Sequence, residues 1–415
     1  MDINRLYSED GELAACLEGE MRRQSDGLEM IASESIQMRG CLELAGSEFN
    51  NKTAVGLPHK QRLKGSRYAA ELETLAARRA CEVFGAEHAN MLPYSGSMAN
   101  FCAYSAVLKT GEGVLALAPE AGAHQTHGGA ANISSRLYSF DFFGLDKDTL
   151  LIDYDEAERK VRELHPRLVV VGSAAYSRNI DYARLADIAH SGGAYLMTDI
   201  AHFSGLIAAG VSPSPVPYAD IVTASTTKTM CGPHSGFIMC KDSLREAVDA
   251  SVYPGNVASL HLQTIAAMAY ALKRSQSEEF RALMRRVVDN TAYFCEALKA
   301  RGFGIVTGGS DCHMFIADLR PLGADAARMA DALEEIGITV NAKGIPYDPS
   351  PSPRGLRAGL TVLTQRGLDR ETLDAVADIW RDVALNTDSE SVIDDCRRRV
   401  AEIAAGFPIP DIYRQ

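Results

Sequence analysis

Short apolar runs alternate with amphipathic stretches through the middle of the chain. The runs are rich in Val, Leu, Ile and Ala, which is typical of strands buried on both faces of a sheet. Between several of them, apolar positions recur every three or four residues and predict helices. Strands and helices that alternate in this way predict an α/β sheet covered on both faces. The apolar runs occupy residues 113–117, 168–172, 194–199, 220–223 and 237–240.

The same pattern divides the chain into three parts. Residues 1–60 are mostly polar with helical pieces, and we interpret them as an N-terminal arm that packs on another part of the structure. Residues 61–275 carry the strand and helix alternation and are predicted to form a large domain, with an early amphipathic helix that Gly85 closes. A long helix rich in Arg and Glu follows, so residues 276–415 are predicted to form a smaller α+β domain.

Composition excludes several classes of function. The net charge of -12 argues against nucleic acid as a general partner. The nine cysteines include no Cys-x-x-Cys pair, so neither a disulfide framework nor a metal cluster is indicated, and a reducing cytoplasm is expected. The first residues lack the apolar core of a signal peptide, and no apolar run approaches ~18 residues. We therefore expect a soluble, cytoplasmic protein that does not bind membranes.

One lysine lies in a setting suited to covalent cofactor chemistry. Lys228 follows an apolar strand inside a run of hydroxyl side chains that includes Ser225. Upstream, Asp199 ends a second buried strand, where a pyridine nitrogen would need a counter-charge. A lysine amine for a Schiff base and a carboxylate for a ring nitrogen together predict pyridoxal 5′-phosphate as the cofactor. We assign Ser225 to cofactor binding as well.

A second segment suits a phosphate group. Residues 93–101 begin as a turn and continue as a helix, so the backbone N–H groups of Gly96, Ser97 and Met98 are expected at a helix N-terminus, where phosphate binds. Taken alone, the Ser-Gly-Ser sequence is more simply explained as a helix N-cap.

Two histidines and an arginine are further candidates. His124 is suited to stack on a pyridine ring and His202 to contact the cofactor, although a single histidine is more often a packed residue. Arg357 follows a proline-rich loop, where its guanidinium would bind a substrate carboxylate through two parallel hydrogen bonds. From local sequence alone, a surface salt bridge explains Arg357 equally well.

Over nearly its whole length the chain resembles serine hydroxymethyltransferase. The resemblance rests on collinear segments that include Leu-Glu-Met-Ile-Ala-Ser-Glu, Pro-Tyr-Ser-Gly-Ser-Met-Ala-Asn, Thr-Asp-Ile-Ala-His and Gly-Gly-Ser-Asp-Cys-His. It implies the fold-type I architecture of pyridoxal-phosphate enzymes, with a large α/β domain and a mixed, mostly parallel sheet. It also implies a homodimer or homotetramer with active sites at the subunit interface. The matching segments are residues 28–34, 93–100, 124–128, 198–202, 205–217, 228–229, 232–233, 308–313 and 357–359.

The resemblance carries specific roles onto these residues. Lys228 corresponds to the lysine that binds the cofactor covalently, Asp199 to the partner of the ring nitrogen, and His124 to the histidine that stacks on the ring. Arg357 with Ser33 corresponds to the site of the substrate carboxylate. Further matches to cofactor contacts are Gly96, Ser97 and His202.

The departures from the family lie on the substrate and folate side. The glutamate that serves the folate-linked proton transfers is Val55 here, and the tyrosine that reaches the neighbouring active site is Thr53. Valine cannot shuttle a proton or hydrogen-bond a pterin. Other family positions are altered too, among them Leu63, Ala174, Thr227, His234, residues 256–261 and Tyr347.

The retained and altered residues together favour folate-independent aldol chemistry. We expect cleavage of the Cα–Cβ bond of a β-hydroxy-α-amino acid, or transfer of its glycine unit to another aldehyde, in specialised natural-product metabolism. Three alternatives stay open. They are an oxygen-using oxidative decarboxylase of a nucleoside-like amino acid, a standard serine hydroxymethyltransferase, and a non-catalytic cofactor-binding subunit.

A basic segment indicates how such a substrate is recognised. The family's Tyr-Tyr-Gly-Gly region appears here as Arg62-Leu-Lys-Gly65, with Arg67 two positions later, so two aromatic hydroxyls are lost and basic groups are gained. In the family this segment reaches the active-site mouth of the neighbouring subunit. The basic residues could equally be an ordinary solvated stretch. We predict that Arg62 and Lys64 bind a polar, anionic or nucleoside-like tail beyond Cβ.

Overall fold

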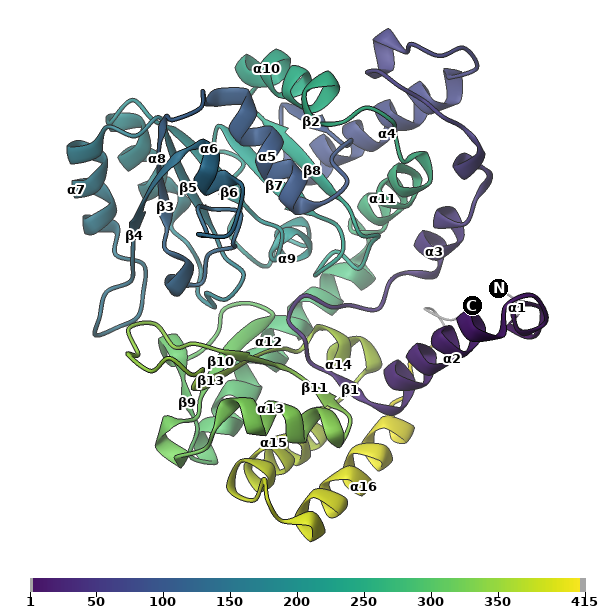
Figure 1. Ribbon diagram of the computed structural model, residues 1–415, viewed down its shortest axis with the longest axis vertical. Helices are drawn as coiled ribbons and strands as arrows, with labels where there is room; N and C mark the ends of the chain where they lie inside the picture. The colour runs from purple at the N-terminus through teal and green to yellow at the C-terminus, as the bar shows by residue number, and fades with distance from the viewer. Residues whose placement is uncertain (1–2, 411–415) are drawn as a thin grey trace.

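The computed structural model describes residues 3–410, which form two lobes (Figure 1). The upper lobe in the figure contains a seven-stranded sheet with the order β2-β8-β7-β6-β5-β3-β4. Strands β3 to β7 run parallel to one another, whereas β8 is antiparallel to both β7 and β2. The strands are β2 (His88–Asn90), β3 (Gly113–Leu117), β4 (Ser139–Phe143), β5 (Leu168–Gly172), β6 (Tyr195–Asp199), β7 (Ile221–Ser225) and β8 (Gly236–Cys240).

Five of these strands confirm the apolar runs predicted from sequence, and the mostly parallel sheet confirms the predicted α/β class. Strands β5 and β7 are buried at every position, as continuous apolar runs require. The pattern missed β2, which has only three residues, and β4, which lies at the sheet edge with exposed and half-exposed positions.

Helices pack on this sheet and around it. Helix α5 contacts β7 and β8, α8 contacts β6, and α7 contacts β3 and β4. The helices of this lobe are α4 (Arg67–Phe84), α5 (Gly96–Val107), α6 (Ser134–Leu137), α7 (Tyr154–Leu164), α8 (Tyr182–Ser191), α9 (Ser204–Ala208), α10 (Arg245–Ala250) and α11 (Leu262–Arg274).

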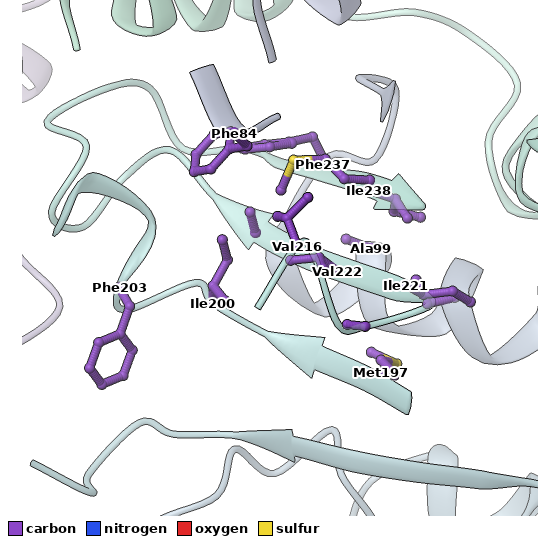
Figure 2. Packing of buried hydrophobic residues seen from close by; sticks show 14 of the residues in the cluster. Phe84, Ala99, Met197, Ile200, Phe203, Val216, Ile221, Val222, Phe237 and Ile238 are labelled. Atoms are coloured by element: carbon purple, nitrogen blue, oxygen red, sulfur yellow. The ribbon is translucent and has the colours of Figure 1, made fainter. Parts of the chain in front are cut away.

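The core of the large lobe joins the sheet to α4. Figure 2 shows Phe237 of β8 beside Phe84, and the rings of these two residues lie 5.8 Å apart. Val222 and Ile238 of the sheet belong to the same cluster. Phe84 ends α4, and Gly85 then adopts a left-handed conformation with φ of 70°. A residue with a Cβ rarely adopts that conformation, which explains why glycine closes this predicted helix.

The lower lobe contains a four-stranded antiparallel sheet with the order β12-β13-β10-β9. Its core centres on Trp380, which is fully buried against Phe294, Phe303 and Phe315. The elements are α12 (Glu278–Ala300), β9 (Gly304–Ile305), β10 (Met314–Asp318), α13 (Ala326–Glu335), β11 (Ile338–Thr339), β12 (Asn341–Lys343), β13 (Gly355–Gly359), α14 (Thr361–Arg366), α15 (Arg370–Leu385) and α16 (Glu390–Gly406).

The N-terminal segment packs against both lobes. Helix α2 (Gly11–Asp26), which follows α1 (Ile3–Glu9), contacts α16, and β1 (Leu28–Glu29) pairs in parallel with β11. Helix α3 (Arg39–Ala45) then contacts α11 of the large lobe. Residues 28–38 therefore cross from one lobe to the other beside the carboxyl ends of the large sheet's strands.

The hydrophobic interior forms two main clusters, and α12 contributes to both. Phe280 and Val287 belong to the cluster of the large lobe, whereas Phe294 and Leu298 belong to that of the small lobe.

The domain boundaries near residues 60 and 275 stay predictions. Between residues 3 and 410, no helix is long and apolar enough to cross a membrane, and no group of side chains is arranged to hold a metal ion.

Candidate active site

The predicted cofactor residues meet at the carboxyl ends of parallel strands. Strand β6 ends at Asp199, β7 ends at Ser225 and leads into Lys228, and β5 leads into Ser173. The N-terminus of α5 faces the same edge, since Ser95 directly precedes Gly96 and both line one cavity with the strand ends. In open α/β sheets, ligands bind outside this edge.

This cavity has a volume of about 350 Å³. A larger cavity of about 790 Å³ lies beside Glu120 and Tyr347, but it contains none of the predicted cofactor residues. We therefore take the smaller cavity as the candidate site, because its lining combines an amine, a buried carboxylate and a helix N-terminus. The predicted residues that line it are Ser33, Gly96, Ser97, His124, Asp199, His202, Ser225 and Lys228.

Asp199 is held by donors from three directions. Its Oδ2 accepts hydrogen bonds from Asn100 Nδ2 at 2.8 Å and His127 Nε2 at 3.2 Å, and its Oδ1 accepts one from the Ala201 amide at 2.8 Å. Burial alone would raise the pKa of Asp199, but these hydrogen bonds and the interaction with His127 outweigh it and lower the pKa. The carboxylate therefore stays ionised although it is only 9% exposed.

A buried network fixes the two side chains that hold Asp199. Tyr104 Oη lies 2.6 Å from His127 Nδ1, so the phenol donates to Nδ1 while Nε2–H points at the carboxylate. Thr223 Oγ1 donates to Asn100 Oδ1 at 2.6 Å, which orients the amide nitrogen toward Asp199. Asn100 Nδ2 also donates to Thr126 Oγ1 at 2.8 Å, so both side chains that donate to Asp199 are fixed by further hydrogen bonds.

Lys228 lies in a tight turn after β7. Its carbonyl accepts a hydrogen bond from the Cys231 amide at 3.1 Å, and Ser35 Oγ donates to the carbonyl of Thr227 at 2.7 Å. Burial lowers the pKa of Lys228, the charge of Asp199 raises it, and Arg357 lowers it further, with a net decrease. A lysine with a lowered pKa has a larger neutral fraction, which is the form that attacks an aldehyde.

Two histidines that line the cavity, His124 and His202, have lowered pKa values, which favours the neutral imidazole. Burial lowers the pKa of His124, and burial together with the charge of Lys228 lowers the pKa of His202 well below its usual value. The ring of His202 stacks on that of His313 with centroids 5.4 Å apart. His313 Nε2 in turn lies 3.1 Å from the carbonyl oxygen of Ala32, next to Ser33.

Arg357 belongs to the small lobe and is not among the residues that line the cavity, but it contacts Ala174 in the cavity wall. It lies on β13, and its Nη1 donates to the carbonyl of Ala174 at 2.7 Å, while its Nη2 donates to Asn341 Oδ1 at 3.2 Å. Its Nε is buried without a hydrogen-bond partner in the described part of the chain. Burial lowers the pKa of the Arg357 guanidinium.

Ser33 is brought to the same place by a close backbone crossing. The Gly359 amide at the end of β13 donates to the carbonyl of Met30 at 2.8 Å. A Cβ on Gly359 would lie 2.8 Å from the Cα of Ala32, so only glycine permits this approach. This crossing places Ser33 near the end of the strand that carries Arg357, and a joint role of the two side chains stays a prediction.

Arg62 and Lys64 lie outside this cavity. Arg62 Nε donates to Tyr253 Oη at 3.1 Å, and Lys64 is exposed, with its carbonyl accepting from Lys52 Nζ at 3.2 Å. Their expected place was the neighbouring subunit's site, so their role stays a prediction.

Sequence reasoning missed several residues of the site. Asn100 and His127, which hold Asp199, were not selected, although both lie in segments that carry the family resemblance. A polar residue inside the apolar helix α5 and the second histidine of His-Gln-Thr-His were the available signals. Other lining residues that were not proposed as site residues are Glu34, Tyr94, Ser95, Ser173, Ala201 and Ser235.

The comparison with protein families agrees with this site. The family model described as serine hydroxymethyltransferase matches residues 6–380, which include every residue that lines the candidate site. Members of that family use pyridoxal phosphate and have fold-type I architecture, so the expected family and fold are confirmed. The chain belongs to the serine hydroxymethyltransferase family of pyridoxal-phosphate-dependent transferases and aldolases.

Proposed function

We propose that this chain is a folate-independent member of its family that acts on a β-hydroxy-α-amino acid. The reaction is cleavage of the Cα–Cβ bond, or transfer of the resulting glycine unit to a second aldehyde. The observation that carries the proposal is a contrast between two groups of residues. The network around Asp199 is complete, whereas the positions that would serve folate hold Val55, Thr53 and Tyr347.

The residues of the cavity fit pyridoxal phosphate. Lys228 would bind the cofactor covalently through its amine, and Asp199 would face the ring nitrogen. The phosphate suits the N-terminus of α5, where Ser95 Oγ caps the Met98 amide at 3.1 Å and Gly96 and Ser97 line the cavity. The donor set therefore matches an aldehyde, a pyridine nitrogen and a dianionic group.

When bound, pyridoxal phosphate stabilises negative charge that develops at the α-carbon of an amino acid. Asp199 would support this by holding a proton at the ring nitrogen, because its own lowered pKa favours the carboxylate. Arg357 would bind the substrate carboxylate and so determine which bond of the α-carbon is presented for cleavage. His124 would pack on the ring as a neutral imidazole.

The altered residues cannot serve the folate reaction. Val55 has no group that could accept or donate a proton. Tyr347, in place of the family asparagine, is turned toward the large lobe, where its hydroxyl accepts from the Leu145 amide at 2.9 Å. The side chain is thereby committed to a contact within the protein.

We propose a homodimer or homotetramer in which Arg62 and Lys64 of one subunit bind a polar or anionic tail at the site of its neighbour. Both side chains are exposed in the single chain and lie outside its own cavity, which supports this assignment. Specialised natural-product metabolism and a cytoplasmic location belong to the same proposal.

The proposal is tested by incubating the protein with β-hydroxy-α-amino acids without folate and measuring aldehyde and oxygen together. We expect aldehyde and glycine to form in equal amounts with no oxygen uptake. Oxygen uptake with release of carbon dioxide would instead identify an oxidative decarboxylase. Lys228→Ala is the control. It should abolish formation of aldehyde, any oxygen uptake, and the visible absorbance of the bound cofactor.

A further inference from the structure

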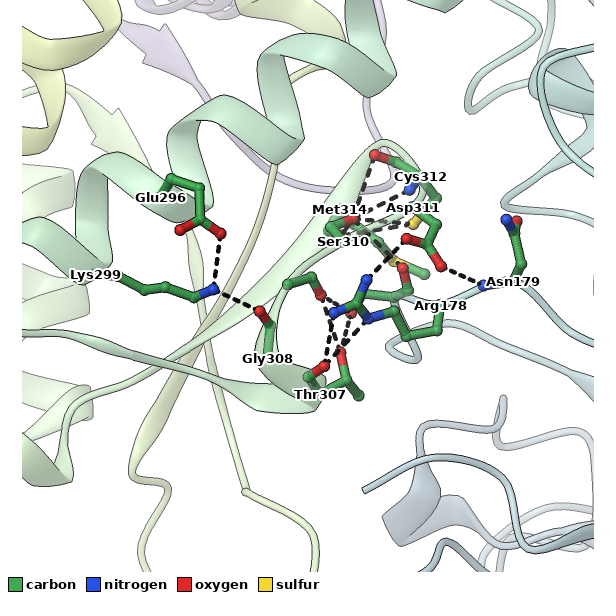
Figure 3. Close-up of polar contacts among 12 residues, drawn as sticks. Arg178, Asn179, Glu296, Lys299, Thr307, Gly308, Ser310, Asp311, Cys312 and Met314 are labelled. Atoms are coloured by element: carbon green, nitrogen blue, oxygen red, sulfur yellow. Dashed lines mark hydrogen bonds and ion pairs between the residues drawn. The ribbon is translucent and has the colours of Figure 1, made fainter. Parts of the chain in front are cut away.

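A dense set of polar contacts joins the two lobes close to the candidate site. Arg178, in the loop after β5, donates from Nε and Nη2 to the carbonyl of Thr307 at 3.1 Å and 2.9 Å. Its Nη1 donates to Asp311 Oδ1 at 2.8 Å, and Asp311 Oδ2 accepts from the Asn179 amide at 3.1 Å. Figure 3 shows Arg178 between Thr307 and Asp311. We call these contacts the Arg178 junction.

The backbone around the junction is shaped to admit the arginine. Thr307 has φ of 64° and Gly308 has φ of 72°, a left-handed conformation that is strained for the threonine. A Cβ on Gly309 would lie 3.0 Å from Arg178 Nη2, so a side chain there would press on the guanidinium. The Asp311 amide donates to the carbonyl of Ser177 at 2.8 Å, which ties the two loops together directly.

The junction and Arg357 form a closed ring of contacts. Arg357 donates to the carbonyl of Ala174, which lies four residues before Arg178 in the same loop. On the small lobe, Ile316 of β10 is the register partner of Arg357 and follows Asp311 by five residues. The same loop of the large lobe therefore holds the small sheet at two points, at Arg178 and at Arg357.

We propose that Arg178 and Asp311 are positioning residues that set where Arg357 stands relative to Lys228. Binding of a carboxylate by Arg357 depends on the direction in which its guanidinium points. The strand that carries Arg357 contacts the large lobe at the loop that contains Ala174. A shift of the small sheet would move Arg357 away from a bound carboxylate. This inference rests on the proposed carboxylate role of Arg357.

The test measures KM for the amino acid, kcat and cofactor content in Arg178→Met. We expect KM to rise roughly tenfold or more, since small misplacements of a binding group have large effects, while the protein still binds the cofactor. Gly309→Ala is a second variant that keeps every charge and should raise KM in the same direction. The matched control is Arg184→Met, which removes the exposed ion pair of Arg184 with Asp155 and should leave KM unchanged.

A double variant separates positioning from general stability. If Arg178 acts through Arg357, then Arg178→Met should add little to the KM already raised in Arg357→Lys, because the two changes affect one interaction. An unchanged KM in Arg178→Met with only a lower Tm would overturn the inference. If Arg357→Lys itself leaves KM unchanged, the carboxylate role of Arg357 fails, whatever Arg178 does.

Discussion

At the scale of single residues, Asp199 has the most completely determined environment in the site. Asn100 and His127 come from different segments, and each is oriented by a further hydrogen bond from Thr223 or Tyr104. This arrangement keeps a buried carboxylate ionised, and an ionised carboxylate is what a protonated ring nitrogen needs beside it.

Asp199→Asn should therefore slow the reaction without expelling the cofactor. An amide can still accept from His127, but it cannot hold a proton at the ring nitrogen, so we expect a rate loss of ~100-fold or more. Single-turnover kinetics at full cofactor content would measure it. Asp220→Asn is a suitable control, because Asp220 accepts from the Leu196 amide at the opposite end of the sheet strands. Near-normal turnover of Asp199→Asn would mean that the aspartate has only a structural role.

Glu73 provides a second residue-scale prediction, on pH dependence. It is 3% exposed on α4, and burial raises its pKa to about 8, although a hydrogen bond from Gln61 lowers it slightly. In the unfolded chain the carboxyl group loses its proton near its ordinary pKa. Between about pH 5 and 8 only the folded state holds that proton, so the free energy of unfolding falls as pH rises.

Glu73→Gln removes this dependence and should stabilise the protein increasingly toward pH 8.5. The expected gain there is on the order of 2–4 kcal/mol, with a smaller gain at pH 5.5. Calorimetric Tm values of variant and parent across that range would measure it. A constant difference in Tm between pH 5.5 and 8.5 would contradict the raised pKa of Glu73.

At the scale of elements, we expect helix capping at the N-terminus of α5 to affect cofactor binding. Ser95→Ala removes the cap on the Met98 amide, which should cost about 1 kcal/mol of stability. It should also weaken cofactor binding, because the N–H groups at this helix end become less ordered. Ser277→Ala is the matched control, since Ser277 caps α12 through the Phe280 amide at 3.2 Å and lies outside the cavity. Equal cofactor affinity in both variants would contradict the prediction, because it would show that the Ser95 cap does not contribute to phosphate binding.

The elements also show how far the sequence pattern reaches. Continuous apolar runs identified β3, β5, β6, β7 and β8, because strands buried on both faces have no polar positions to interrupt the run. The pattern could not identify β1, whose two residues become a strand only by pairing with β11 more than three hundred residues later. In the site, the sequence identified Lys228 and Asp199 because each lies at or just after the end of an apolar run. The contact of His127 with Asp199, 72 residues away, depends on folding of the whole lobe.

At the scale of the whole molecule, the site draws on both lobes and on the N-terminal segment. The large lobe supplies Lys228 and Asp199, Arg357 of the small lobe contacts Ala174 in the cavity wall, and residues 30–33 cross between the lobes beside Gly359. Amino-acid binding should therefore depend on the relative position of the lobes, whereas cofactor binding depends mainly on the large lobe. We therefore expect changes at the Arg178 junction to weaken amino-acid binding more than cofactor binding.

We propose that this chain keeps the residues for cofactor chemistry and has lost the folate site. This claim is tested most directly by calorimetric titration of the cofactor-loaded protein with tetrahydrofolate in the presence of glycine. We predict no saturable binding at concentrations up to about 1 mM, the weak end of the usual range of small-ligand affinities. Saturable binding of tetrahydrofolate in the micromolar range would contradict the claim.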